Sequence, residues 1–245
     1  MTPAQTTRAI AAQSTAEFMM TLRRGESVLV TLVIPVALMV FFASAKFLPA
    51  AGREIAFLLP GTLALAVISS GLVSLGIATA YERYYGVLKR LGVTPLPRGG
   101  LIAAKLLSIA ALELLQIILL GLIAALGYGW KPHGSIALAL LALLLGSVAF
   151  AGLGLAMAGR LRAEATLAAA NGLFLFFLLL GGLYVPLDHL PGLLVPLARF
   201  LPAAALASVL RSALDGTSVS IDSLALLIGW AIAMPLLATR VFRWE

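Results

Sequence analysis

The chain has 245 residues, of which 62% are hydrophobic and only 11% are charged, and its mean hydropathy is +1.08. A soluble domain carries about 25% charged residues. The apolar residues here instead fall into uncharged runs close to bilayer length, so we expect a multi-pass membrane protein. The net charge of +7 arises from Lys and Arg at the ends of these runs, which fits membrane topology and does not indicate a nucleic-acid partner. Cysteine is absent and the two histidines stand in separate loops, which excludes disulfides and argues against a Cys/His metal site.

Residues 1–26 are mixed polar with a weak apolar face, which fits either a helix lying in the headgroup region or a disordered tail. The uncharged run 27–45 follows as the first expected span. Its end, Ala43-Ser44-Ala45, resembles the cleavage site of a secretory signal. The apolar run is longer than a signal core, however, and the polar segment before it is unusually long. We therefore interpret 27–45 as a retained span.

Five further spans are expected from the hydropathy pattern, at 55–80, 106–130, 134–159, 165–187 and 223–239. The apolar segment between the last two carries three prolines that favour two short helices over a seventh span: Pro191, Pro196 and Pro202. Six spans with both termini cytoplasmic also place most of the Lys and Arg residues on the inner face. The predicted fold class is an all-α membrane protein with a single transmembrane domain, 1–245.

The connection between the second and third spans, 81–105, holds five of the seventeen Lys and Arg residues. Read as a helix, it places five apolar side chains on one stripe: Tyr81, Tyr84, Tyr85, Leu88 and Leu91. The charged residues point elsewhere, and the prolines that follow end the helix. The pattern predicts a short amphipathic, basic helix on the membrane surface, with its other face available to contact a partner.

Glu113 is the one carboxylate deep inside a predicted span; Gln116 lies one turn further on, and Asn171 is in the fifth span. Burying a carboxylate is costly, so Glu113 is expected to face the bundle interior, a wet cavity or a polar partner. Two interpretations stay open. These residues either line a substrate path or titrate, or they are held by neighbouring polar groups and only fix the packing of helices.

Two other features predict structure rather than chemistry. The many small residues of 134–159 predict close helix packing, within the chain in preference to a subunit interface. Arg211 and Asp215, four residues apart, predict a minor surface ion pair.

The chain has no G-x-x-x-x-G-K-[ST], G-x-S-x-G or H-E-x-x-H motif, so we expect neither nucleotide hydrolysis nor a cofactor or metal on this chain.

The motifs together resemble the ABC-type-2 exporter permeases, the group that includes daunorubicin-resistance and nodulation-factor exporters. Their signature E-R-E-x-G-x-L-x-x-L-x-x-x-P, with a lysine beginning the third span, is similar to Glu82, Arg83, Gly86, Leu88, Leu91, Pro95 and Lys105. Their S-G-x-x-x-P-x-x-x-L-P, which precedes two external re-entrant helices, resembles the segment with Gly182, Pro186 and Pro191. Leu59-Pro60-Gly61 is similar to an element of their second span. The chain departs from the signature at Tyr84, where the family has an acid, and at Lys89, where it often has Glu.

The resemblance implies a permease subunit that works as a homodimer docked on two copies of a separate ABC ATPase, which holds the ATP and Mg²⁺. The helix after the second span would be the coupling helix that contacts the ATPase, through Glu82, Arg83, Tyr85, Gly86, Leu88, Leu91 and Pro95. A hydrophobic or amphipathic substrate, such as a drug, lipid or glycolipid, would be expelled across the plasma membrane (the bacterial inner membrane), as in multidrug efflux. The alternative is a proton- or ion-coupled secondary transporter with Glu113 as the ion site.

Overall fold

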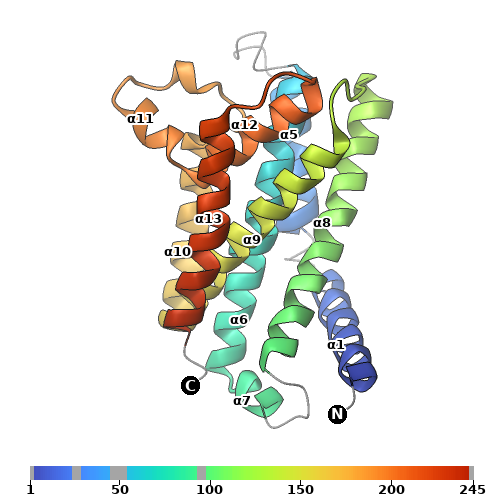
Figure 1. The fold of residues 1–245 in the computed structure, drawn as a ribbon, viewed down its shortest axis with the longest axis vertical. Coiled ribbons are helices and arrows are strands. Elements are labelled where there is room, and N and C mark those ends of the chain that lie inside the picture. Colours follow the sequence, from blue (N-terminus) through green and yellow to red (C-terminus); the bar gives the residue numbers. More distant parts are fainter. Residues whose placement is uncertain (1–2, 24–28, 45–53, 93–97, 243–245) are drawn as a thin grey trace.

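The structure, a computed structural model, describes residues 3–23, 29–44, 54–92 and 98–242, and these ranges contain helices and connections but no strand. The helices form an elongated bundle (Figure 1). At one end lie the start of α1 (Pro3–Arg23), the short α7 (Val87–Gly92) and the end of α13 (Ile221–Val241). At the opposite end lie α11 (Leu194–Arg199) and α12 (Pro202–Asp215).

Five helices are long and apolar enough to cross a membrane, so a multi-pass membrane protein is confirmed. They are Ile55–Tyr84, Gly99–Tyr128, Ile136–Arg160, Ala163–Leu180 and Ile221–Val241. Each corresponds to a predicted span. The predicted first span, 27–45, is described from residue 29 to 44 as a π-helical turn, η1 (Leu29–Val33), followed by α3 (Ile34–Ser44). This apolar helix is shorter than the other five, and the six-span count is therefore not confirmed.

The first long helix occupies the centre of the bundle. It consists of α5 (Ile55–Val67), a π-helical segment η2 (Ile68–Ser74) and α6 (Leu75–Tyr84). Ten consecutive residues of α5, from Leu58 to Val67, are buried, because α3, α8 (Arg98–Tyr128), α9 (Ile136–Arg160) and α12 all pack around them. Such a helix is apolar all round, as expected for a span enclosed by other spans.

The predicted close packing of the fourth span is confirmed. A Cβ atom on Gly154 of α9 would lie 2.6 Å from the carbonyl oxygen of Gly71, and one on Gly152 would lie 2.6 Å from the nitrogen of Pro235 in α13. Only glycine lets the backbones of α9, η2 and α13 approach this closely. The small-residue face of α9 therefore serves contacts within the chain.

The segment after the fifth span forms two short helices, as the prolines predict. The fifth span itself, α10 (Ala163–Leu180), ends seven residues before the predicted boundary of 187. It ends there because the chain turns at Gly182, which adopts a φ of +64° that other residues rarely adopt. A 3₁₀ turn, η3 (Leu187–His189), leads to α11. Pro202 is the first residue of α12, where its lack of an N–H group removes no hydrogen bond within the helix.

Arg211 is not the surface partner of Asp215 that the spacing predicts, although the two charges still attract each other. Arg211 of α12 points into the protein, where it donates hydrogen bonds to the carbonyls of Gly182 (2.6 Å) and Leu183 (3.0 Å). Its guanidinium also stacks over the ring of Phe57 at 3.8 Å. The unpaired carbonyls of the turn after α10 thus attract Arg211 more strongly than a solvated carboxylate does. Arg211 fixes that turn to α12 and α5.

Candidate functional site

The connection between the second and third spans forms a tip at the end of the bundle near the termini. The predicted single amphipathic helix is wrong here, because α6 ends at Tyr84 and α7 begins at Val87. Gly86 lies between them with a φ of +69°, which no helix can contain. The five residues of the predicted stripe are therefore divided between two helices and do not share one face.

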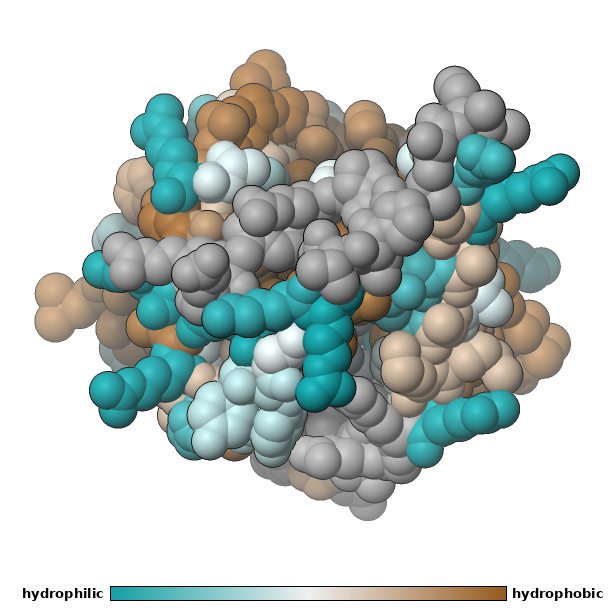
Figure 2. Space-filling view, turned by 90° about the horizontal axis from the view of Figure 1, so that it is seen from below, coloured by the Kyte–Doolittle hydropathy of each residue, from teal (hydrophilic) through white to brown (hydrophobic). Residues whose placement is uncertain are grey.

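Because of this break, the exposed side chains differ from those that a single helix would expose. Tyr84 and Tyr85 are 64% and 66% exposed, whereas Leu88 is only 2% exposed. The rings of the two tyrosines meet edge to face at 5.1 Å, and Lys89 and Arg90 beside them are exposed. We call Tyr84, Tyr85, Lys89 and Arg90 the α6–α7 tip. Figure 2 shows hydrophilic side chains gathered on this end of the molecule, with hydrophobic surface along its sides.

A buried ion cluster lies directly behind the tip. Lys105 of α8 is 3% exposed, and its Nζ lies 2.7 Å from a carboxylate oxygen of Glu82 in α6 and 3.0 Å from one of Glu17 in α1. A buried ammonium group requires such partners, because it loses its hydration on burial. Lys105 therefore joins α1, α6 and α8 at one point.

Arg83, the residue after Glu82, joins α6 to α9, in addition to the three helices that Lys105 joins. Its guanidinium donates hydrogen bonds to the carbonyl of Gly159, at 2.6 Å, and to that of Leu161. These carbonyls belong to the end of α9, where helical carbonyls lack partners and carry partial negative charge. Glu82 and Arg83 thus anchor the end of α6 on two sides, and neither belongs to the exposed surface of the tip.

A second polar cluster lies inside the bundle, around Glu113. Ser70 of η2 donates a hydrogen bond to the carboxyl group of Glu113 at 2.8 Å, and Ser147 of α9 also hydrogen bonds with it. One turn further along α8, Gln116 donates to the carbonyl of Thr31 in η1 at 2.5 Å. The two polar residues of α8 therefore contact the two π-helical segments. Segments of this kind are frequent at functional sites in helices.

The remaining predicted site residues lie elsewhere. Asn171 is exposed on α10 and does not join Glu113, so the serines supply the partners of the carboxyl group. Gly182 forms the turn that Arg211 holds; Pro186 and Pro191 flank η3 at the opposite end of the bundle from the tip. Pro95 lies outside the residues that the structure describes. The sequence did not indicate the contacts that Glu17 and Arg211 make, because their hydrogen-bond partners are 88 and 29 residues away in the chain.

These observations define an α-helical multi-pass membrane protein with a basic aromatic tip anchored by buried charges. A family comparison goes further: the family model "ABC-2 type transporter" matches residues 8–214. The chain belongs to the ABC-2 type transporter family. It is also 25% identical over 240 residues to the protein "Putative transport permease YvfS" of Bacillus subtilis (strain 168), covering 94% of this chain and 96% of that protein. Membership supports a transport permease and implies partnership with an ABC ATPase.

Proposed function

We propose that the chain is the membrane subunit of an ATP-driven exporter and that the α6–α7 tip is its docking site for a separate ABC ATPase. The observation that carries the proposal is the pair Tyr84 and Tyr85, which are about two-thirds exposed at the end of an otherwise apolar bundle. Exposed tyrosines beside basic residues are typical of the residues that dominate the affinity of protein interfaces. The ATPase would bind the ATP and Mg²⁺.

The anchoring of the tip suits it to transmit force. The side chain of Leu88 in α7 is buried. Glu82 and Arg83 bind the end of α6 to α1, α8 and α9. A displacement of the tip by the ATPase would therefore move four helices rather than bend one loop. Since α6 continues through η2 into α5, the same displacement would reach the polar cluster around Glu113.

Orientation and assembly follow from the same proposal. The tip, the start of α1 and the end of α13 would face the cytoplasm, as the excess of Lys and Arg in these segments favours. The exporter would contain two permease chains, with two ATPase subunits, in the plasma membrane. The apolar character of the spans favours a hydrophobic or amphipathic substrate such as a drug, lipid or glycolipid.

The test is co-expression with the products of the neighbouring reading frames, followed by purification of the complex and measurement of coupled ATP hydrolysis; purification without any ABC ATPase would contradict the proposal. The double variant Tyr84→Ala/Tyr85→Ala should weaken association about tenfold or more, because each truncation removes exposed aromatic contact area. Tyr128→Ala is the matched control, since Tyr128 is 40% exposed at the other end of α8. Equal association of the double variant and the control would contradict docking through the tip.

A proton-coupled transporter is the second candidate function, because Glu113 is a buried carboxyl group within a span. In that case transport would run without ATP and stop when the proton gradient is dissipated. Glu113→Gln would then abolish transport while preserving a polar contact with Ser70. In the exporter that we propose, transport requires ATP and continues without a proton gradient.

A further inference from the structure

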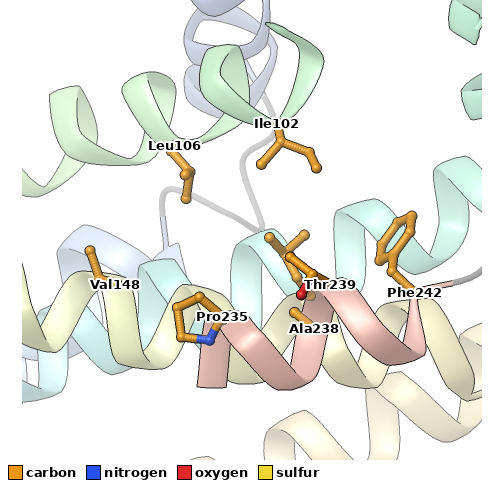
Figure 3. Close-up of a pocket in the computed structure, with 9 residues that line it drawn as sticks. Ile102, Leu106, Val148, Pro235, Ala238, Thr239 and Phe242 are labelled. Atoms are coloured by element: carbon orange, nitrogen blue, oxygen red, sulfur yellow. The ribbon is translucent and has the colours of Figure 1, made fainter. Parts of the chain in front are cut away.

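An apolar cavity of about 330 Å³ lies between α8, α9 and α13, in the half of the bundle that carries the tip. Figure 3 shows Ile102 and Leu106 of α8 pointing across it toward α13. Pro235 and Thr239 of α13 line the opposite wall. The cavity exists because α13 packs closely on α9 through Gly152, whereas α8 packs chiefly against α1 and α5.

The cavity lining includes residues on the surface of membrane-spanning helices. Leu106, Val148 and Thr239 line it and are also exposed on the protein surface. All three belong to helices long enough to cross a membrane. The ligand would therefore enter from the hydrocarbon of the leaflet on the side of the tip, and not from water.

The lining selects a hydrocarbon chain. Its one hydroxyl group, on Thr239, already donates a hydrogen bond to the carbonyl of Leu236 at 2.9 Å. Pockets that hold drug-like molecules add a few convergent polar groups to fix orientation, and the other residues of this lining are apolar. From Pro235 to Phe242 the cavity follows α13 for about 10 Å, which suits a narrow flexible chain.

Two arginines follow residues at the end of the cavity near the tip. Phe242 packs against Gly159 there, and Arg160 follows Gly159 in the chain. Arg240 follows Thr239 of the lining. Both arginines are exposed, and neither has an ion pair with any residue that the structure describes. Guanidinium groups at this level of a membrane protein bind phosphate groups.

We propose that this cavity binds one acyl chain of an anionic phospholipid of the cytoplasmic leaflet, with its phosphate near Arg160 and Arg240. The lipid stabilises the separation between the start of α8 and the end of α13. Lys105 lies between Ile102 and Leu106 in α8, so the lipid contacts the same helical turn that holds the buried ion cluster.

The test uses the purified full chain in vesicles that contain phosphatidylglycerol with a photoactivatable diazirine in its acyl chain, without ATPase or ATP. Labelled peptides are quantified by mass spectrometry. We expect label concentrated on 102–106 and 235–242, above the level on Leu126, which is 84% exposed and lies outside the cavity lining. Because no ATPase is present, the result does not depend on the proposed exporter function.

Two variants separate the cavity from general lipid contact. Val148→Trp fills the cavity and should lower the labelling of both peptides about fivefold. Leu144→Trp, one turn away on α9 and 59% exposed, enlarges the lipid-facing surface and should leave labelling unchanged. Size-exclusion profiles and helix content establish that both variants are folded.

Three results would overturn the proposal. The first is labelling that follows lipid exposure alone, and the second is equal labelling in the Val148→Trp variant and the unmodified chain. The third is a bound mass other than phospholipid in native mass spectrometry, which would assign the cavity to another hydrophobic ligand. The charge requirement has its own test: the Arg160→Gln/Arg240→Gln variant should lose the preference for phosphatidylglycerol over phosphatidylcholine. Equal labelling by both lipids in the unmodified chain would refute that requirement.

Discussion

Replacing Lys105 with Met removes the cation that neutralises two carboxylates. The side chain of Lys105 is 4% exposed, and those of Glu17 and Glu82 are 11% and 20% exposed. Removing one partner of a buried ion pair costs about 3–5 kcal/mol, and the partial exposure of the two carboxylates places this cost near the lower limit, about 3 kcal/mol. The docked state of α1 on α8 should therefore lose stability by a factor on the order of 100.

Hydrogen exchange measured by mass spectrometry on the full chain in detergent detects this loss directly. Amides of α1 near Glu17 should exchange on the order of 100-fold faster in Lys105→Met, because α1 detaches from α8 more often. Amides of α13 serve as the internal control, since the ion cluster does not include α13. Far-UV circular dichroism confirms that the variant keeps its helices.

A triple variant distinguishes the ion cluster from simple loss of the Lys105 side chain. Glu17→Gln and Glu82→Gln, added to Lys105→Met, remove the two carboxylates that the single variant leaves unpaired. Replacing a complete buried charge cluster is often nearly neutral, whereas breaking it is costly. Exchange in α1 should therefore slow again in the triple variant. Slow exchange in the single variant, or equally fast exchange in both, would refute the reasoning.

Three further changes test the fold around the site, each by thermal unfolding of the purified chain. Gly86→Ala should destabilise the α6–α7 tip by about 1 kcal/mol, because its φ of +69° is strained for alanine although a Cβ there meets nothing within 4 Å. Arg211→Leu should cost about 1.5–3 kcal/mol, since it leaves buried carbonyls of the turn after α10 without a donor. Gly61→Ala should prevent folding or shift α5, because its Cβ would lie 1.9 Å from the carbonyl oxygen of Leu183. Gly172→Ala is the control: it has open space around it in the interior of α10 and should leave stability equal or slightly higher.

Elements that depend on local composition could be predicted from the sequence. Five spans follow from uncharged runs of bilayer length, and Pro202 correctly indicates a helix start within an apolar segment. The early end of α10 could have been predicted from the adjacent glycines Gly181 and Gly182, but the apolar run to 187 concealed it. Hydropathy indicates where a span lies but not the residue at which its helix ends.

Features that depend on distant contacts could not be predicted. The break at Gly86 was missed because a single glycine is tolerated in a helix, and the burial of Leu88 becomes evident only in the folded chain. Arg211 has an acidic neighbour four residues away, so local spacing favours a surface pair. The carbonyls that Arg211 binds come within hydrogen-bonding distance of it only when α10 and α12 have packed together.

The two polar clusters connect the same pair of helices, and this has a mechanical consequence. The central helix descends toward the tip and α8 rises away from it, so Glu82 with Lys105 joins them near the tip, and Ser70 with Glu113 joins them within the bundle. Two helices fixed at two separate points cannot slide past each other without breaking one charged or buried polar contact, which costs several kcal/mol in a membrane interior. The central helix and α8 also have polar contacts with α9, through Arg83 near the tip and through Ser147, which hydrogen bonds with Glu113. A force applied at the tip is therefore expected to move the central helix and α8 together, with α9 held to them at the same two levels.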